Sequence, residues 1–379
     1  MRRMLLLGAL AGLCATRAAR ADELIVPEPG QIVKNPDLAQ VKKNKWWPFG
    51  GTYWRVWGGS IAGSQPKGVS VTADGKVFLT NTGFHDHENV HRWDPDKLTV
   101  IAKVDFKGNA VESEVSPDGK ILYVSNFYHQ EMLALSTDDL HIVRRYKVGN
   151  VPKHFAVSPD GKTLYVSNWT SGTLSVVDVD KGTITRTIKV GKQPRGTAIT
   201  RDGKKVYVTE FGSNVIAVID TAKLEIVATI DPKCRAPRHA VATRDDRFIL
   251  ATCYGGNEMV VIDRNTDKIV RRVEVGRGPK TVDVSHDGNF AFTADYRNNT
   301  ITFIDMRTWE TKQVPLPVHK SSGVTVTADD ARVYVTGWDS RNLIVIERLM
   351  PGIAPGKPSP KQATGKCERV PESECHKYP

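Results

Sequence analysis

Five histidines of the chain could together bind a transition metal. His85, His87 and His91 stand close together in "GFHDHENVH", and we expect His129 and His319 to reach the same sector of the fold. Imidazole is the common protein ligand of copper and zinc, and a His-x-His pair with a third histidine four residues on is a plausible ligand spacing. The sequence therefore predicts a copper or zinc site here, and the alternative interpretation is ordinary surface histidines in a polar loop.

Basic and aromatic residues recur along the chain at intervals of about 42 residues. If the fold brings these equivalent positions together, they form a positively charged funnel with an aromatic rim, which suits an anionic ligand. The alternative is that the aromatic rings wedge neighbouring units apart and that the basic side chains form a solvated ring. The candidate ligand-binding residues are Lys67, Lys153, Arg195, Arg238, Lys280, His154, His239, Trp169, Phe211, Tyr254, Tyr296 and Trp338, with Phe127 at the same position as the aromatic residues.

Oxygen-bearing side chains directly precede most of these aromatic residues. They are Asn126, Asn168, Glu210 and Asp295, and Asn81 stands at the equivalent position of the first unit. Several such ligands could bind a hard cation such as calcium. More often, Asn and Asp at these positions satisfy the backbone of a local turn. Calcium is therefore a less favoured hypothesis than copper or zinc.

Several familiar catalytic and cofactor motifs do not occur in the sequence. There is no Cys-x-x-Cys-His haem site, no Gly-x-Ser-x-Gly nucleophile elbow and no phosphate-binding loop. Motif evidence therefore supports none of these chemistries, and the sequence leaves open whether the protein is an enzyme.

The candidate residues are carried by a sevenfold internal repeat. Each unit contains four short apolar-alternating stretches, the first two joined by an Asp-Gly turn or a variant of it. Asp-Gly between such stretches indicates a hairpin, because glycine accepts the positive φ of the turn. Four strands per unit at this period predict an all-β fold, a seven-bladed β-propeller of four-stranded blades. The anchor aspartates are Asp74, Asp118, Asp160, Asp202, Asp245, Asp287 and Asp329, with spacings of 42 to 44 residues.

Propeller topology places the candidate residues at one end of the central channel. The loops that precede the first strand and follow the second strand of each blade meet at this end, which we call the top face. Ligands of propellers usually bind where such loops converge on a concave surface. The basic, aromatic and metal-ligand candidates should therefore share the top face.

The last repeat unit lacks a fourth strand, because "MPGIAPGKPSP" follows its third strand and prolines and glycines forbid another. The segment "TYWRVWGGSIAGSQP", which begins at Thr52, has the pattern of a fourth strand followed by the usual loop. We predict that this N-terminal segment closes blade seven and removes an exposed sheet edge.

The repeats resemble the YVTN (YncE-like) family of seven-bladed propellers. The signature occurs as Tyr123-Val124-Ser125-Asn126 and Tyr165-Val166-Ser167-Asn168, with variants at Tyr207 and Tyr334, and it extends roughly from Thr52 to Leu349. The resemblance implies the fold. It implies little about activity, since the family includes exported proteins without assigned activity, nucleic-acid binders, lactonase-like enzymes and redox domains.

The ends of the chain predict export. Residues 1–21 combine an arginine-bearing start, a short apolar run and a small-x-small site, which indicates a signal peptide cleaved after Ala21. Residues 22–51 should form an extended lead-in that lays Trp46, Trp47 and Phe49 on the propeller of residues 52–349, and residues 350–379 a tail rich in Pro, Gly and Lys. The formal net charge is +11, and four arginines leave with the signal peptide, so the mature chain remains basic.

Four cysteines remain after cleavage. In an oxidising compartment they suggest two disulfides, for which three connectivities exist. Cys234 and Cys253 should both lie at the top of adjacent strands in blade five, so we predict that they pair and that Cys367 pairs with Cys375 in the tail.

These observations together predict a periplasmic or secreted propeller without a membrane span, which acts as a non-enzymatic binding or scaffold protein through a basic, histidine-bearing top face. Its partner would be an anionic small molecule or a protein. The alternatives are a hydrolase or oxidoreductase dependent on copper, zinc or calcium, and a nucleic-acid-binding propeller. The oligomeric state stays open.

Overall fold

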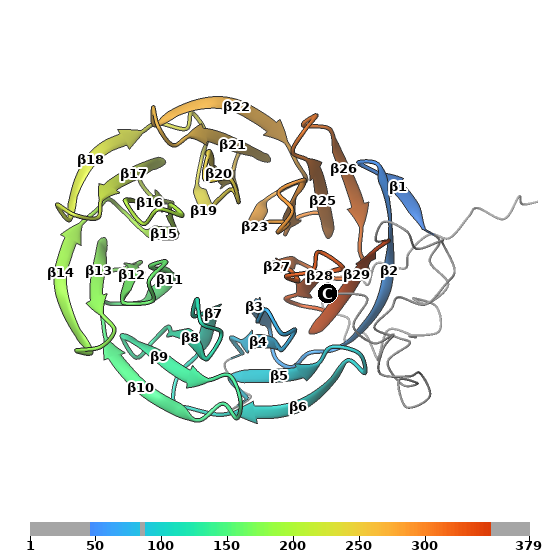
Figure 1. Cartoon of the computed structure of the whole chain (residues 1–379), viewed down its shortest axis with the longest axis horizontal. Coiled ribbons are helices and arrows are strands. Elements are labelled where there is room, and N and C mark those ends of the chain that lie inside the picture. The colour runs from blue at the N-terminus through green and yellow to red at the C-terminus, as the bar shows by residue number, and fades with distance from the viewer. Residues whose placement is uncertain (1–45, 84–87, 350–379) are drawn as a thin grey trace, which may run out of the picture.

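The computed structural model describes residues 46–83 and 88–349. Seven β-sheets stand around a central channel (Figure 1), and every regular element in these two ranges is a β-strand. The prediction of a seven-bladed propeller is therefore confirmed. Within the same ranges, no helix is long and apolar enough to cross a bilayer.

The strands of each blade follow one another outwards from the channel (Figure 1). Blades one and two contain β3 (Pro66–Val71), β4 (Val77–Asn81), β5 (Val90–Asp94), β6 (Thr99–Val104), β7 (Ala110–Val115), β8 (Ile121–Asn126), β9 (Glu131–Ser136) and β10 (Ile142–Lys147). Blades three and four contain β11 (Pro152–Val157), β12 (Thr163–Asn168), β13 (Thr173–Asp178), β14 (Thr183–Lys189), β15 (Pro194–Ile199), β16 (Lys205–Glu210), β17 (Val215–Asp220) and β18 (Glu225–Ile230). Blades five and six contain β19 (Pro237–Ala242), β20 (Phe248–Cys253), β21 (Glu258–Asp263), β22 (Lys268–Glu274), β23 (Pro279–Val284), β24 (Phe290–Asp295), β25 (Thr300–Asp305) and β26 (Thr311–Pro315). Blade seven contains β27 (Ser321–Val326), β28 (Arg332–Gly337), β29 (Asn342–Arg348), β2 (Thr52–Ile61) and β1 (Trp47–Phe49).

A single turn chemistry shapes the first hairpin of every blade. A Ser or Thr hydroxyl at the end of the innermost strand donates to the carboxylate of the anchor aspartate two residues later, for example Ser158 to Asp160 at 2.5 Å and Thr200 to Asp202 at 2.8 Å. The next residue takes the left-handed conformation that the turn requires; it is a glycine in five blades, as at Gly161 with a φ of 73°, and Asp246 or Asp330 in the other two. The repeated Asp-Gly pattern is thus a repeated turn.

The N-terminal segment closes the ring as predicted. β2 pairs antiparallel with β29 from Trp54 opposite Arg348 to Ile61 opposite Asn342, and an Arg55–Glu347 ion pair of 2.6 Å links the two strands. The end of the predicted extended lead-in is a regular element: Trp47–Phe49 form the short strand β1, which pairs with β2. Blade seven therefore has five strands.

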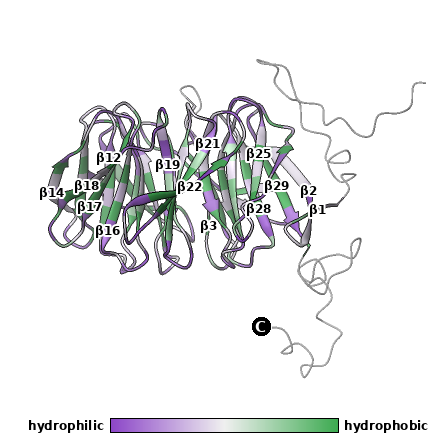
Figure 2. Ribbon diagram, turned by 90° about the horizontal axis from the view of Figure 1, so that it is seen from above, coloured by the Kyte–Doolittle hydropathy of each residue, from purple (hydrophilic) through white to green (hydrophobic). Residues whose placement is uncertain are grey.

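The core of the molecule lies between neighbouring blades. Figure 2 shows the ring from the side, with hydrophobic residues distributed along the strands of every blade in view. Between blades six and seven, Trp54 of β2 contacts Phe290, Phe292 and Phe303, all four fully buried. Apolar residues occur on both faces of the sheets because each face is covered by the next blade.

Candidate functional site

The five candidate cations occupy the same position in the innermost strands of five blades. Lys67, Lys153, Arg195, Arg238 and Lys280 are each the second residue of an innermost strand that begins with proline. In all seven blades the pairing of this strand with its neighbour shifts register just after the first residue. Such a bulge redirects side chains, so two consecutive residues can both face the open interior. We call these five residues the cation ring.

Aromatic side chains alternate with the members of the cation ring. The Lys153 ammonium lies 3.8 Å from the ring centroid of Phe127 and 5.3 Å from that of Trp169. The Arg195 guanidinium lies 5.2 Å from the centroid of Trp169 and 5.8 Å from that of Phe211. Lys280 lies between two rings, with its ammonium 4.4 Å from the ring centroid of Tyr296 and 4.5 Å from that of Trp338. The Arg238 guanidinium lies 4.9 Å from the ring centroid of Tyr254.

The structure therefore brings together the basic and aromatic residues that the sequence pairs by position. The aromatic rings also touch across blades, with centroid distances of 5.3 Å for Trp169 to Phe211 and 6.1 Å for Phe211 to Tyr254. The aromatic rings therefore contact one another across neighbouring blades and also lie at cation–π distances from the basic side chains. That these residues bind an anionic ligand stays a prediction.

Basic side chains outnumber carboxylates around the cation ring. Among the residues that the structure describes there, Lys67 forms an ion pair with Glu112, the residue that follows Val111 in β7. Burial lowers the pKa of Lys67 to about 7, although the Glu112 carboxylate favours its charged form. Burial, reinforced by repulsion from Arg195 and Lys67, lowers the pKa of Lys153 to about 5.

The other side of the ring shows the same effect. Burial and the neighbouring cations lower the pKa of Arg238 and that of Lys280 well below their usual values. Burial alone would raise the pKa of Glu112, but the Lys67 ammonium holds it at about 2. Protonation of each further basic side chain in the cation ring is therefore disfavoured by burial and by repulsion from its neighbours. A bound anion would favour the protonated forms and raise these pKa values.

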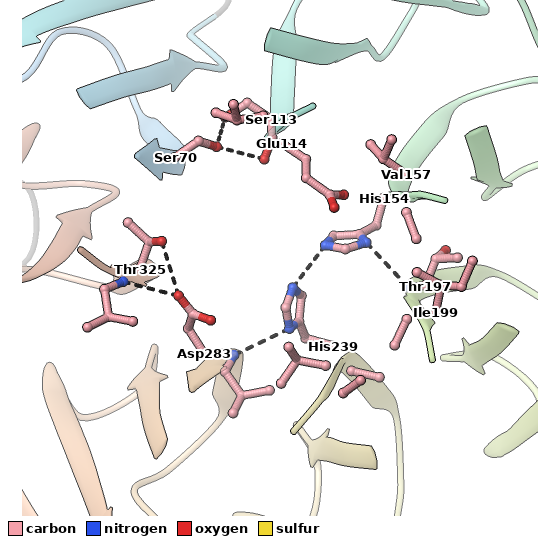
Figure 3. Close-up of a pocket in the computed structure, with 18 of the residues that line it drawn as sticks. Ser70, Ser113, Glu114, His154, Val157, Thr197, Ile199, His239, Asp283 and Thr325 are labelled. Carbon is pink, nitrogen blue, oxygen red and sulfur yellow. Dashed lines mark hydrogen bonds between the residues drawn. The ribbon is translucent and has the colours of Figure 1, made fainter. Parts of the chain in front are cut away.

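His154 and His239 lie deeper in the channel than expected. The sequence places them in loops of the top face, but they are the third residues of β11 and β19, where the bulge turns them towards the channel axis. Their Nε2 atoms are 2.9 Å apart (Figure 3). They line the upper part of a cavity of about 530 Å³, to which the innermost strands of all seven blades contribute.

The histidines proposed to bind a metal are not assembled in the described part of the chain. His85 and His87 lie outside the described residues. His91 lies within strand β5, not in the preceding loop, and its Nε2 is 3.0 Å from a carboxylate oxygen of Glu88. The Nδ1 of His319 is 3.0 Å from a carboxylate oxygen of Asp339.

His129 lies in blade two, where a Cβ on Gly108 would come 2.7 Å from its ring. Across residues 46–83 and 88–349, the ligand atoms of one trio of His, Cys, Asp or Glu residues lie within 4.8 Å of one another, and this trio is Cys234, Cys253 and Glu258. Since the two cysteines are bonded to each other, the trio is not a metal site. The copper or zinc hypothesis stays untested.

Two of the oxygen-bearing residues proposed for calcium, Asp295 and Asn126, use their side-chain oxygens in local hydrogen bonds, whereas the buried Oδ1 atoms of Asn81 and Asn168 have no hydrogen-bond partner among the described residues. The fully buried Asp295 accepts bonds from the hydroxyls of Thr293, Thr300 and Thr302 at 2.6 to 2.9 Å. The amide group of Asn126 bonds to the backbone of its own blade. These contacts match the structural role that such residues usually have in turns.

The predicted disulfide between Cys234 and Cys253 is present in blade five. Cys234 precedes β19 and Cys253 ends β20, so the bond joins the entry of the innermost strand to its neighbour. Cys367 and Cys375 lie outside the described residues.

Sequence reasoning missed the acidic residues of the channel. Glu112 occupies the position of His154 in blade two, and Glu114 and Asp283 share a lower position in blades two and six that faces the cavity. The available signal was the repeat itself, because the sixth and fourth residues before each anchor aspartate also align. Comparing these columns for unusual residues would have identified them.

The comparisons with known proteins agree with this architecture. The model of the YNCE-like beta-propeller family matches residues 61–289. Among solved structures, a chain of hydrazine synthase from Kuenenia stuttgartiensis is similar, with a TM-score of 0.67 and 21% sequence identity over 75% of this chain and 95% of that chain. At this identity the likeness shows the fold alone. No curated protein matches the sequence.

Proposed function

The chain belongs to the YNCE-like β-propeller family, and we propose that it is an exported binding protein that holds an anionic ligand on its basic, histidine-bearing top face without transforming it. The ligand is a small anion or an acidic patch on a protein partner. The observation that carries this proposal is the cation ring, in which five blades contribute a basic residue at the same position.

Electrostatics support an anion as the natural occupant. Buried or half-buried like charges repel one another, and proteins normally pair them with opposite charges. Here one carboxylate, Glu112, is paired with Lys67, while the neighbouring Lys153, Arg195 and Arg238 face aromatic rings. An anion at the mouth would supply the missing negative charge.

Export is supported by two observations of different kinds. The first is the signal-like segment of residues 1–21. The second is the Cys234–Cys253 disulfide, because such bonds persist in oxidising compartments such as the periplasm or the extracellular space. Mass spectrometry of the protein purified from the periplasm or medium tests this, with a mature N-terminus at Asp22 expected.

The test of the binding function uses benzene-1,3,5-tricarboxylate, a rigid trianion that is fully ionised at neutral pH, and a poly-glutamate peptide as the protein-like probe. Isothermal titration calorimetry should show binding of at least one probe that weakens as salt is added. Arg195→Ala and Arg238→Ala should each weaken binding about tenfold or more. The matched control is Arg186→Ala, which removes an equal charge from an exposed position on the outer strand β14.

The proposal is overturned if neither probe binds, or if Arg186→Ala weakens binding as much as the cation-ring variants do. Melting temperatures of the three variants should stay close to that of the wild type, which separates lost binding from lost folding. A single-stranded oligonucleotide that binds while both anionic probes fail would favour the nucleic-acid alternative.

A further inference from the structure

The His154–His239 pair contains more N–H protons than its contacts can accept. Beneath the cation ring the two imidazoles meet edge to face, with ring planes at 89° and their Nε2 atoms 2.9 Å apart. They belong to blades three and five. Between them, blade four has Gly196 at the equivalent position, where a Cβ would lie 2.7 Å from the Cα of His239. The glycine lets side chains of two non-adjacent blades meet.

The outer nitrogen of each imidazole faces a backbone donor of the following blade. The amide N–H of Thr197 points to Nδ1 of His154 at 3.3 Å, and the amide N–H of Val282 points to Nδ1 of His239 at 3.4 Å (Figure 3). A backbone amide can only donate, so each Nδ1 must supply its lone pair. The ring proton of each neutral imidazole is then on Nε2.

Counting protons shows the conflict. Two backbone amides and two neutral imidazoles carry four N–H protons, and three nitrogen-to-nitrogen contacts join these four groups. Each contact accommodates one proton, so one contact must set donor against donor. Both rings are neutral at pH 7, since burial lowers the pKa of His154 to about 4 and that of His239 well below its usual value.

A metal ion between the two Nε2 atoms would not resolve the conflict. Coordination needs a lone pair on each Nε2, which moves each ring proton to Nδ1, against the backbone N–H. An acceptor atom resolves it completely, because both Nε2–H groups then donate to the acceptor and both backbone bonds are kept. The two rings must separate slightly to admit it.

We propose that His154 and His239 form a two-donor site for a small oxyanion, a carboxylate or an inorganic oxyanion, which enters the central cavity and binds between the two Nε2–H groups. The site lies beneath the cation ring and within reach of its charges, since Lys67 and Glu112 act electrostatically on both imidazoles. Its test does not depend on the function proposed above. It would be a second binding site inside the channel.

The cavity below the pair suits such a ligand. Its volume of about 530 Å³ accommodates a small organic acid with several waters. Glu114 points towards the pair (Figure 3), and burial raises its pKa to about 8, so at neutral pH it is an additional O–H donor and not a competing anion. The carboxylate of Asp283 already accepts bonds from the Thr325 hydroxyl and the Val326 amide at 3.1 Å. Two arginines of the cavity lining, Arg201 and Arg244, add positive charge.

The first experiment reads the tautomers directly in the wild-type protein. With ¹⁵N-labelled histidine, two-bond ¹H–¹⁵N spectra should show both rings protonated on Nε2, and sodium acetate or sodium phosphate should shift the two Nε2–H signals. His154→Phe and His239→Phe provide the assignments. A proton on Nδ1 of either ring, or signals that neither salt shifts, would overturn the proposal.

The second experiment measures affinity. His239→Phe should weaken acetate or phosphate binding about tenfold or more, whereas His239→Gln, which keeps an N–H donor near the Nε2 position, should remain within about threefold of the wild type. Binding of acetate but not phosphate would identify an organic carboxylate as the ligand class, and the reverse an inorganic oxyanion. Equal affinities of the Phe variant and the wild type would refute the site. Because the tautomer result needs no benzenetricarboxylate binding, failure of the cation-ring function and failure of this site are distinguishable.

Discussion

Replacing Trp54 by alanine should destabilise the whole propeller, although this residue precedes the first repeat. Trp54 is fully buried in β2, and its indole lies 4.9 Å from the ring centroid of Phe303 and 5.3 Å from that of Phe290, both in blade six. The side chain thus joins the closing strand to the neighbouring blade. Losing it should loosen both the closure of blade seven and its packing against blade six.

The size of the effect follows from the buried surface. An aromatic side chain buries about 150–250 Å², which at about 25 cal/mol per Å² corresponds to about 4–6 kcal/mol as an upper bound. Measured substitutions of buried Trp or Phe by Ala cost about 3–5 kcal/mol. We therefore expect Trp54→Ala to lower the free energy of unfolding by about 3–5 kcal/mol.

The assay is urea unfolding followed by far-ultraviolet circular dichroism, with the neighbouring Tyr53→Ala as the matched control. Tyr53 is 44% exposed on the same strand, and its backbone bond to Leu349 survives the substitution, so the control should cost less than about 1 kcal/mol. If Trp54→Ala cost no more than Tyr53→Ala, β2 would not be essential to closing the ring.

Three further predictions follow from the disulfide and the channel. The double variant Cys234→Ala/Cys253→Ala opens a loop with a sequence separation of 19 and should lose about 3 kcal/mol of stability in urea unfolding; a loss below about 1 kcal/mol would contradict this. Binding of benzenetricarboxylate should weaken about tenfold from pH 6 to pH 9 in calorimetry, because the pKa of Lys67 is about 7 and a bound anion raises it by about one unit; constant affinity would show that Lys67 does not contribute. Folded Glu114, with a pKa of about 8, keeps a proton that the unfolded chain releases above its usual pKa, so the wild type loses stability as pH rises through this window. Glu114→Gln should therefore gain about 1 kcal/mol or more relative to the wild type between pH 5 and pH 9, and parallel stability curves would argue against it.

Local patterns were sufficient to predict the blades. The Asp-Gly turns depend on contacts between residues two apart in the sequence, such as Ser158 with Asp160, so the hairpin can be predicted from each repeat by itself. The constant period then sets the number of blades, and the proline-rich end of the last repeat leaves an edge with which the strand-like segment at Thr52 was predicted to pair, as it does in the structure. The disulfide followed from the same map, because Cys234 just before β19 and Cys253 at the end of β20 lie at the same end of adjacent strands of one blade.

The meeting of His154 and His239 could not be predicted in this way. They are 85 residues apart, and their contact depends on the ring curvature, on a bulge in each innermost strand and on the missing side chain of Gly196 between them. The pKa of Glu114 depends likewise on how deeply the assembled channel buries it. The sequence determined which residues recur at equivalent positions, since recurrence is local along the chain. The tertiary structure alone decided how far each one reaches into the channel and what it meets there, because those distances are set by the packing of blades that are remote in sequence.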